Sequence, residues 1–224
     1  MRLFRLAARW LVLSAGLGAV FPTPALAQTV PALARNDRSI ERVAGFSWFS
    51  PGGSLGGITD RRVYLTGLRS ENVLGAGRRI AVAYTMELVP LAIVERTAPN
   101  TQWCRHDQWG RHLCRFNRSA RVAVGAGGSP LGFKLYFNRT SRVRVHAAGS
   151  AGMLFFSSEV PVYNSRRANF TFDYGGGVEI PLRNSRAVTF SYRFQHISNA
   201  GTGAYNPGLD ANVVSIGLIN RPAR

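Results

Sequence analysis

Eight segments of the chain alternate between apolar and polar residues with a period of two, and this pattern constrains the fold more than any other feature. A β-strand places successive side chains on opposite faces, so each segment is predicted to form a strand with one apolar and one polar face. The segments cover residues 41–49, 62–69, 79–94, 121–137, 142–156, 169–180, 188–199 and 210–219. The chain is therefore predicted to be an all-β protein.

The polar faces of these segments carry charges of both signs, on Glu87, Lys134, Arg144, His146, Asp173, Glu179, Arg193 and Gln195 among others, together with many glycines. A soluble sandwich would turn such faces to water, whereas an outer-membrane barrel would enclose them. The even strand number and the large aromatic residues on the apolar faces favour an eight-stranded antiparallel outer-membrane β-barrel. A barrel of eight strands is filled by its own side chains, so no pore is expected.

The predicted connections alternate between short and long. Three are short, at 75–78, 138–141 and 182–186, and four are longer, at 51–61, 97–120, 159–168 and 199–209. Outer-membrane barrels keep short turns on the periplasmic side and longer loops outside. The joint between the last two predicted strands is thus expected at the outer surface.

Residues 1–27 have the features of a secretory signal peptide. Arg2, Arg5 and Arg9 form a basic start, an apolar run follows over 11–21, and small residues precede Gln28. We expect residues 28–224 to form one domain outside the cytoplasm, in the outer membrane of a Gram-negative cell.

The net charge of +17 becomes +14 when the three arginines of the signal peptide are removed (17 − 3), and Lys134 is the only lysine. Nucleic acid fits poorly as a partner of an exported chain without a recognisable nucleic-acid module. The guanidinium group suits phosphate and carboxylate, both abundant on lipopolysaccharide. Lipopolysaccharide and membrane lipid are therefore the expected partners, and the sequence leaves monomer and homodimer open.

The two cysteines, Cys104 and Cys114, are predicted to form a disulfide after export. Such a loop closure would contribute about 3 kcal/mol. His106 and His112 lie between them, which offers zinc as an alternative, but the spacing lacks the usual Cys-x-x-Cys knuckle. No metal is expected.

Reactive residues extend the apolar face of the seventh predicted strand. Counting from Val188 by twos leads to His196 and Ser198, and the parity of the eighth strand puts Asp210 on the same face. A serine nucleophile requires a base within hydrogen-bond reach and a third group that orients the base. His196, Ser198 and Asp210 are the candidates for these roles.

The loop between the last two strands is rich in hydrogen-bond donors, which an oxyanion intermediate requires. Asn206 and the backbone near Gly201 are the candidate donors, and Asn199 contributes a further amide beside Ser198. Residues 52–56 (Gly-Gly-Ser-Leu-Gly) match the G-x-S-x-G nucleophile elbow, but that motif requires a strand-to-helix turn. Because this segment joins two predicted strands, we interpret it as a hairpin loop.

Residues 196–201 (His-Ile-Ser-Asn-Ala-Gly) and 206–210 (Asn-Pro-Gly-Leu-Asp) resemble the active-site hairpin of the PagL-type lipid A 3-O-deacylases, outer-membrane barrel esterases also called acyloxyacyl hydrolases. The resemblance implies His196 as base, Ser198 as nucleophile, and the residue fourteen positions after the histidine as the acid. That residue is Asp210, where the best-known members have glutamate. The family asparagine near the oxyanion falls on Asn206.

The resemblance is close over 186–219 and looser over the rest of the predicted domain. The chain departs from outer-membrane barrels at its end, because residues 220–224 lack a terminal aromatic residue. The sequence thus predicts a serine esterase that removes an ester-linked acyl chain, at the 3-O position by resemblance, from lipid A without a cofactor. The alternative is a non-enzymatic barrel for adhesion or envelope stability.

Overall fold

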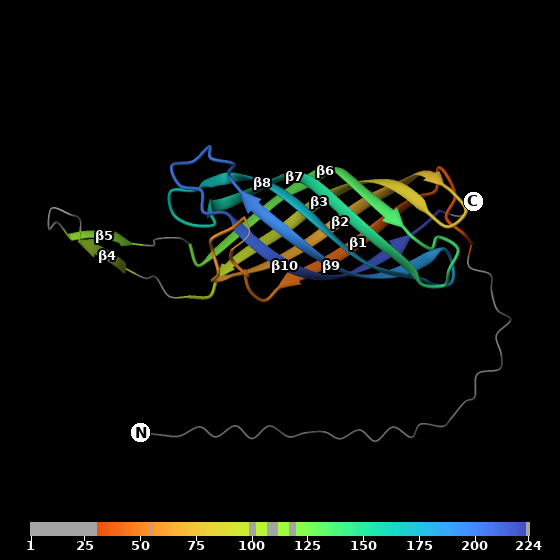
Figure 1. Ribbon diagram of the computed structural model, residues 1–224, viewed down its shortest axis with the longest axis horizontal. Coiled ribbons are helices and arrows are strands. Elements are labelled where there is room, and N and C mark those ends of the chain that lie inside the picture. Colours follow the sequence, from red (N-terminus) through yellow and green to blue (C-terminus); the bar gives the residue numbers. More distant parts are fainter. Residues whose placement is uncertain (1–30, 54, 99–101, 107–111, 117–119, 223–224) are drawn as a thin grey trace, which may run out of the picture.

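The computed structural model describes residues 31–53, 55–98, 102–106, 112–116 and 120–222. Eight antiparallel strands close into a barrel in the order β1-β10-β9-β8-β7-β6-β3-β2, which confirms the expected fold (Figure 1). Their bounds are β1 Arg38–Ser47, β2 Arg61–Ala76, β3 Ala81–Arg96, β6 Val122–Tyr136, β7 Arg144–Val160, β8 Arg166–Pro181, β9 Arg186–Ser198 and β10 Leu209–Asn220. The expected signal peptide, 1–27, lies outside the described residues.

The strands differ from the expected segments mainly in length. β2 continues seven residues past Arg69, to Ala76, although Ser70 and Asn72 interrupt its apolar face. Both β1 and β3 pair with this stretch, so backbone hydrogen bonds extend the strand where the side-chain pattern fades. β7 and β8 are longer too, which reduces the expected loop 159–168 to residues 161–165.

A small hairpin that the sequence pattern did not indicate lies in the connection between β3 and β6. Its strands are β4 (Gln102–His106) and β5 (His112–Phe116), which pair with each other in a separate two-stranded sheet. No helix in the described ranges is long and apolar enough to cross a membrane.

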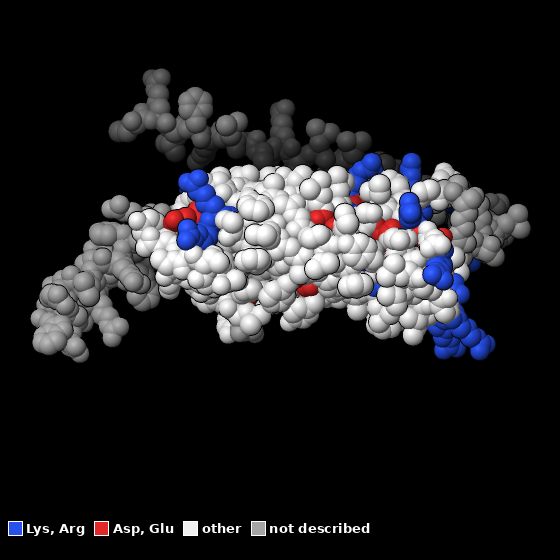
Figure 2. All heavy atoms as spheres, turned by 90° about the horizontal axis from the view of Figure 1, so that it is seen from above, with Lys and Arg blue, Asp and Glu red and all other residues white. Residues whose placement is uncertain are grey.

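The outer wall of the barrel is apolar. Exposed large side chains occur on every barrel strand, among them Ile40, Leu68, Met86, Leu131, Phe155, Tyr174, Phe190 and Ile216. In the face shown in Figure 2, Lys and Arg side chains gather toward the two ends and leave the middle without a basic residue. This distribution is the one that a hydrocarbon layer around the middle of the barrel would favour.

The barrel interior has three layers along its axis. An apolar cluster fills the end that carries the longer connections, with Val63, Val94, Leu154, Ile197, Leu209 and Val213 among its members. A smaller apolar cluster, which includes Leu33, Val73 and Tyr136, closes the end with the short turns. Charged residues occupy the space between them, and side chains fill the interior as an eight-stranded barrel requires.

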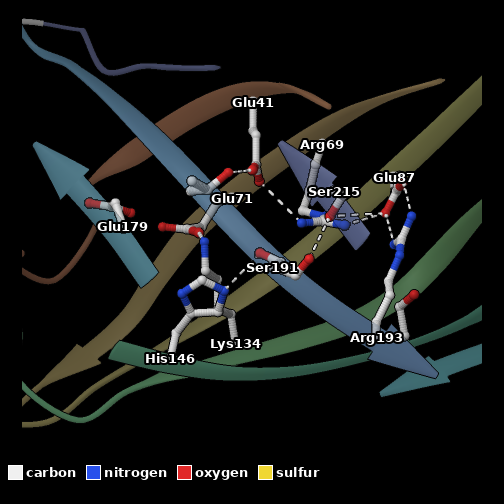
Figure 3. Close-up of polar contacts among 12 residues, drawn as sticks. Glu41, Arg69, Glu71, Glu87, Lys134, His146, Glu179, Ser191, Arg193 and Ser215 are labelled. Atoms are coloured by element: carbon white, nitrogen blue, oxygen red, sulfur yellow. Dashed lines mark hydrogen bonds and ion pairs between the residues drawn. The ribbon is translucent and has the colours of Figure 1, made fainter. Parts of the chain in front are cut away.

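The charged layer is a network of ion pairs in which acids and bases alternate (Figure 3). Arg69 bridges Glu41 at 3.1 Å and Glu87 at 2.7 Å, and Arg193 also reaches Glu87 at 3.1 Å. Nearer the short turns, Glu179 receives Arg144 at 2.7 Å and Arg221 at 2.8 Å. Pairing offsets part of the cost of burying these charges, and removal of one partner would leave a buried charge uncompensated.

Another interior pair and a ring complete this layer. Lys134 Nζ lies 3.3 Å from Glu71. His146 is buried, as its inward parity predicted. Its Nε2 lies 3.4 Å from Ser191 Oγ. The remaining space beside Lys134 is a cavity of about 10 Å³. Such a cavity holds at most about one water molecule, so the interior has no passage there.

Closure of the barrel joins the first strand of the chain to the last. β1 pairs with β10 from Ile40↔Asn220 to Phe46↔Val214. The connection from β1 to β2 therefore lies beside the start of β10, and Ile58 forms a parallel bridge with Leu209. This arrangement brings two loops that are far apart in sequence to one edge of the barrel.

Candidate active site

His196 and Ser198 lie on the outer wall at the end of β9. The alternating residues Arg193, Gln195 and Ile197 are buried inside the barrel, whereas Phe190 and Tyr192 are exposed outside it. His196 and Ser198 share the parity of the exposed residues. Across the strand pair with β8, they stand opposite Phe172 and Phe170 respectively.

His196 makes a hydrogen bond with Asp210 on the neighbouring strand. The two residues are partners in the β9–β10 register, and His196 Nδ1 lies 2.6 Å from Asp210 Oδ1. Both are buried although they face outward, with 8% of His196 and none of Asp210 exposed. The ring of Phe172 lies against the imidazole, with 5.2 Å between ring centroids. A carboxylate in this position fixes the orientation of the ring.

The second carboxylate oxygen of Asp210 is held by the loop between β1 and β2. Asp210 Oδ2 accepts hydrogen bonds from the backbone N–H groups of Leu55 at 3.1 Å and Gly56 at 2.9 Å. We call these two residues the amide clamp. The clamp covers Asp210 from outside, which explains why an outward-facing carboxylate is fully buried.

The amide clamp belongs to the segment 52–56 whose sequence resembles a nucleophile elbow. The interpretation of that segment as a loop between strands is confirmed, since it joins β1 to β2. Sequence reasoning did not identify its contact with Asp210. No local signal reveals it, because 154 residues separate Gly56 from Asp210 and only barrel closure brings them together.

Asn199 organises the connection between β9 and β10. Its side chain is fully buried, and its Oδ1 accepts hydrogen bonds from the backbone N–H groups of Gly201 at 3.0 Å and Gly203 at 3.4 Å. Its Nδ2 donates to Tyr205 O at 2.9 Å. The Gly201 amide, expected as an oxyanion donor, is therefore occupied by Asn199 in this structure.

Asn206 lies in the same loop and is exposed. Its Oδ1 accepts a hydrogen bond from the backbone N–H of Asn199 at 3.1 Å. Because the oxygen is anchored, the NH2 group at the other end of the amide is oriented away from this contact. The side chain of Asn206 is thus fixed through its oxygen and keeps an NH2 group that can donate.

An apolar groove of about 750 Å³ begins at His196 and Ser198 and crosses the outer wall. It extends over β8, β7 and β6, lined by Phe170, Phe172, Ala151, Met153, Gly128 and Leu131 among others. Neighbouring strands lie about 4.8 Å apart, so a path from β9 to β6 is about 14 Å long. Small residues on β6 and β7, such as Gly128 and Ala151, leave this space open.

Ser198 is partly buried and shares this groove with His196. Within the described ranges, its hydroxyl makes no hydrogen bond with the imidazole. The structure therefore joins His196 to Asp210 directly and brings Ser198 to the same groove. In unliganded active sites such nucleophile–base contacts are often long and become shorter when substrate binds.

The two cysteines occupy opposed positions in the β4–β5 hairpin. Cys104 pairs with Cys114 in the backbone register. Opposed residues of antiparallel strands have Cα atoms about 4.5–5.5 Å apart, a separation that a disulfide can bridge. The disulfide stays a prediction. Across the described part of the chain, no group of His, Cys, Asp and Glu residues is arranged to hold a metal ion.

Two solved structures of outer-membrane proteins resemble this chain. The crystal structure of the outer membrane enzyme PagL is similar at 15% sequence identity with a TM-score of 0.50, over 80% of this chain and 97% of that chain. The crystal structure of Neisserial surface protein A matches at 9% identity with a TM-score of 0.49, over 83% of this chain and 97% of that chain. At such identities the likeness concerns the fold.

A search of curated proteins gave no match. The model of the family described as lipid A 3-O-deacylase (PagL) matches residues 89–218, which is 130 of the 224 residues (218 − 89 + 1). This range includes β9, the loop after it and most of β10, and thus His196, Ser198, Asn206 and Asp210. The chain therefore belongs to the lipid A 3-O-deacylase (PagL) family.

Proposed function

We propose that this protein is a lipid A deacylase of the outer membrane, a serine esterase that releases the acyl chain ester-linked at the 3-O position. Family membership supports lipid A as the substrate. The observation that carries the mechanism is the hydrogen-bonded His196–Asp210 pair on the outer wall, at the same groove as Ser198. A lipid substrate can reach this groove without leaving the membrane, which an interior site would not allow.

In the proposed reaction, Ser198 Oγ attacks the carbonyl carbon of the acyl ester. His196 Nε2 takes the hydroxyl proton, because Nδ1 is engaged by Asp210. Asp210 keeps the proton on Nδ1 and stabilises the imidazolium that forms. A rotation of the Ser198 side chain toward the imidazole accompanies substrate binding in this scheme.

The tetrahedral intermediate carries a negative charge that requires donors. The NH2 group of Asn206 supplies one, since its amide is anchored through Oδ1 to the backbone of Asn199. The charge develops at the end of the apolar groove, where a donor fixed in advance stabilises it more than mobile water would. Asn199 and Gly201 support this donor by shaping the loop.

Collapse of the intermediate releases the lipid A hydroxyl, which takes the proton from His196, and leaves the fatty acid esterified to Ser198. Water activated by His196 then hydrolyses the acyl-enzyme. The groove across β8, β7 and β6 holds the acyl chain during both steps. Because the chain passes from the hydrocarbon of the membrane into an apolar groove, the groove serves mainly to position the ester at Ser198.

The test compares lipid A from cells that express the wild-type protein or Ser198→Ala. We expect mass spectrometry to show lipid A that lacks one hydroxyacyl or acyl chain only with the wild type. The purified wild type should release fatty acid in detergent, and Ser198→Ala should be slower by at least about a thousandfold. Identical lipid A from both strains, with both barrels folded in the membrane, would refute the proposal.

A further inference from the structure

The acid of the proposed triad is held from two sides by different parts of the fold. Asp210 Oδ1 meets His196 Nδ1 at 2.6 Å, and Oδ2 meets the amide clamp, with Leu55 N at 3.1 Å and Gly56 N at 2.9 Å. Two N–H donors on one carboxylate oxygen fix the rotation of the carboxylate plane. The oxygen that remains is then directed at the imidazole.

We infer that the backbone of Leu55 and Gly56 is a positioning element of the active site, which sets the short aspartate at 210 in register with His196. This inference rests on the proposed function. A carboxylate attached through a single methylene has little freedom to reach toward a partner. Here the backbone amides of the loop between β1 and β2 lie against the carboxylate, so a longer side chain is not required.

The clamp requires glycine at position 56. A Cβ atom at Gly56 would lie 2.7 Å from Asp210 N, 2.9 Å from Asp210 Oδ1 and 2.9 Å from Leu209 C. Two of these atoms belong to backbone, so they cannot move aside cheaply. Any larger residue therefore displaces the loop from β10 and withdraws the N–H groups from Oδ2.

Gly208 shows how closely the three parts fit. It has a φ of +66°, and a Cβ atom there would lie 2.9 Å from His196 Cε1 and 3.0 Å from Leu55 O. The loop after β9 thus packs between the imidazole and the clamp. The base, the acid and the clamp form one contact surface on the outside of the barrel.

The position next to the clamp offers a matched control. A Cβ atom at Gly57 would meet only Pro207 O, at 3.5 Å, which is ordinary van der Waals contact. Gly57→Ala changes the same loop by the same single methyl group and leaves the clamp in place. Comparison of the two variants separates displacement of the clamp from a general effect on the loop.

The experiment measures kcat and KM of the detergent-purified enzyme on an acyl ester substrate, with heat-modifiable gel mobility as the test of folding. We expect Gly56→Ala to lower kcat by about 10- to 100-fold with little change in KM, as a displaced catalytic group does. Gly57→Ala should stay within about twofold of the wild type.

A double variant tests whether the loss of kcat in Gly56→Ala depends on the carboxylate of Asp210. In Asp210→Asn, which lacks the carboxylate, Gly56→Ala should cause no further loss. Equal losses in the two backgrounds would overturn the inference, as would a Gly56→Ala enzyme with the kcat of the wild type. A merely structural role of Gly56 predicts equal losses, because it does not depend on the carboxylate.

Asp210→Glu provides an independent variant in case Gly56→Ala does not fold. Its longer side chain cannot keep both amides and Nδ1 at their present distances, so we expect kcat to fall by about tenfold or more. A glutamate variant as active as the wild type would overturn the inference. If Ser198→Ala keeps its activity, the proposed function itself fails, whatever the clamp variants show.

Discussion

The charged network inside the barrel and the His196–Asp210 pair on its outer wall are both buried, yet they differ in what surrounds them. Inside, the carboxylates are paired with basic side chains, and Glu179 meets two of them, Arg144 and Arg221. Outside, Asp210 meets one imidazole and two backbone amides, and the imidazole borders an open groove. The interior charges are enclosed and neutralise one another, whereas the outer pair has one side that faces a groove and so has capacity left for chemistry.

The interior network and the outer pair also bury their charges in different ways. Ion pairs inside the barrel use side chains from many strands, together with Arg221 just past the end of β10. The outer pair would be exposed without residues 55 and 56, which cover it and donate to it. Function on the outer wall therefore depends on loop geometry, and stability depends on the strands.

The largest effect should follow from removal of the outer carboxylate. We expect Asp210→Asn to lower kcat by about a thousandfold or more, because the amide no longer holds the proton on Nδ1 of His196. Stability should change little, since the barrel network is untouched. Steady-state kinetics and urea unfolding of the same preparation check both statements. Activity close to that of the wild type would remove the distinction between the two clusters.

The converse change inside the barrel should act on stability. Glu179→Gln leaves Arg144 and Arg221 without their carboxylate in a fully buried position. We expect the free energy of unfolding to fall by about 3 kcal/mol, as when one partner of a buried ion pair is removed. The kcat of the folded fraction should stay the same. A matched loss of activity in folded protein would show that the interior network and the site are coupled.

Blocking the groove should produce a smaller effect that depends on substrate length. Ala151 lies beside Leu131 and Phe172 in the register and lines the groove. Ala151→Phe should lower kcat/KM for long acyl esters by about 10- to 100-fold, because the ring displaces the acyl chain and moves its ester away from Ser198. The loss should shrink as the acyl chain is shortened.

A matched control for the groove is available on the same wall. Val214 faces outward on β10 with 60% of its surface exposed and does not line the groove. Val214→Phe adds a similar aromatic group away from the site. An equal loss of kcat/KM for both variants would argue against the groove as the acyl-chain site.

The smallest effect should come from an exposed ion pair. Arg62 lies 3.7 Å from Glu95, and their side chains are 43% and 27% exposed. We expect Arg62→Ala to change the free energy of unfolding by less than about 1 kcal/mol, since water and salt screen such a pair. Urea unfolding of Arg62→Ala and Glu179→Gln under the same conditions measures the two losses. A loss as large as that of Glu179→Gln would mean that burial does not separate the two kinds of pair.

The alternation of residues was sufficient to predict the eight strands and the two faces of each, and the even strand number and outward aromatic residues indicated which face lies inside. It placed Glu87, Lys134 and Glu179 inside and His196 and Ser198 outside, as the structure has them. This worked because the period of a strand is two and each face of a barrel wall has one environment. Strand ends were less predictable, as β2 shows, because pairing with neighbours continues after the side-chain pattern stops.

The candidate site was predictable to the extent that it lies on one hairpin. His196 and Asp210 face each other in the β9–β10 register, which their parity and the intervening loop already indicated. The spacing also indicated Ser198 and Asn206. These residues are close in sequence, so local strand geometry is enough to bring them together.

The amide clamp, the groove and the partners within the ion-pair network came only from the tertiary structure. Leu55 and Gly56 reach Asp210 because β1 closes on β10, and the groove exists because four strands place small and aromatic residues side by side. Periodicity tells which way a side chain faces, since that depends on its own strand. Which distant residue it meets depends on how the strands are ordered and staggered around the barrel, and no local stretch of sequence carries that information.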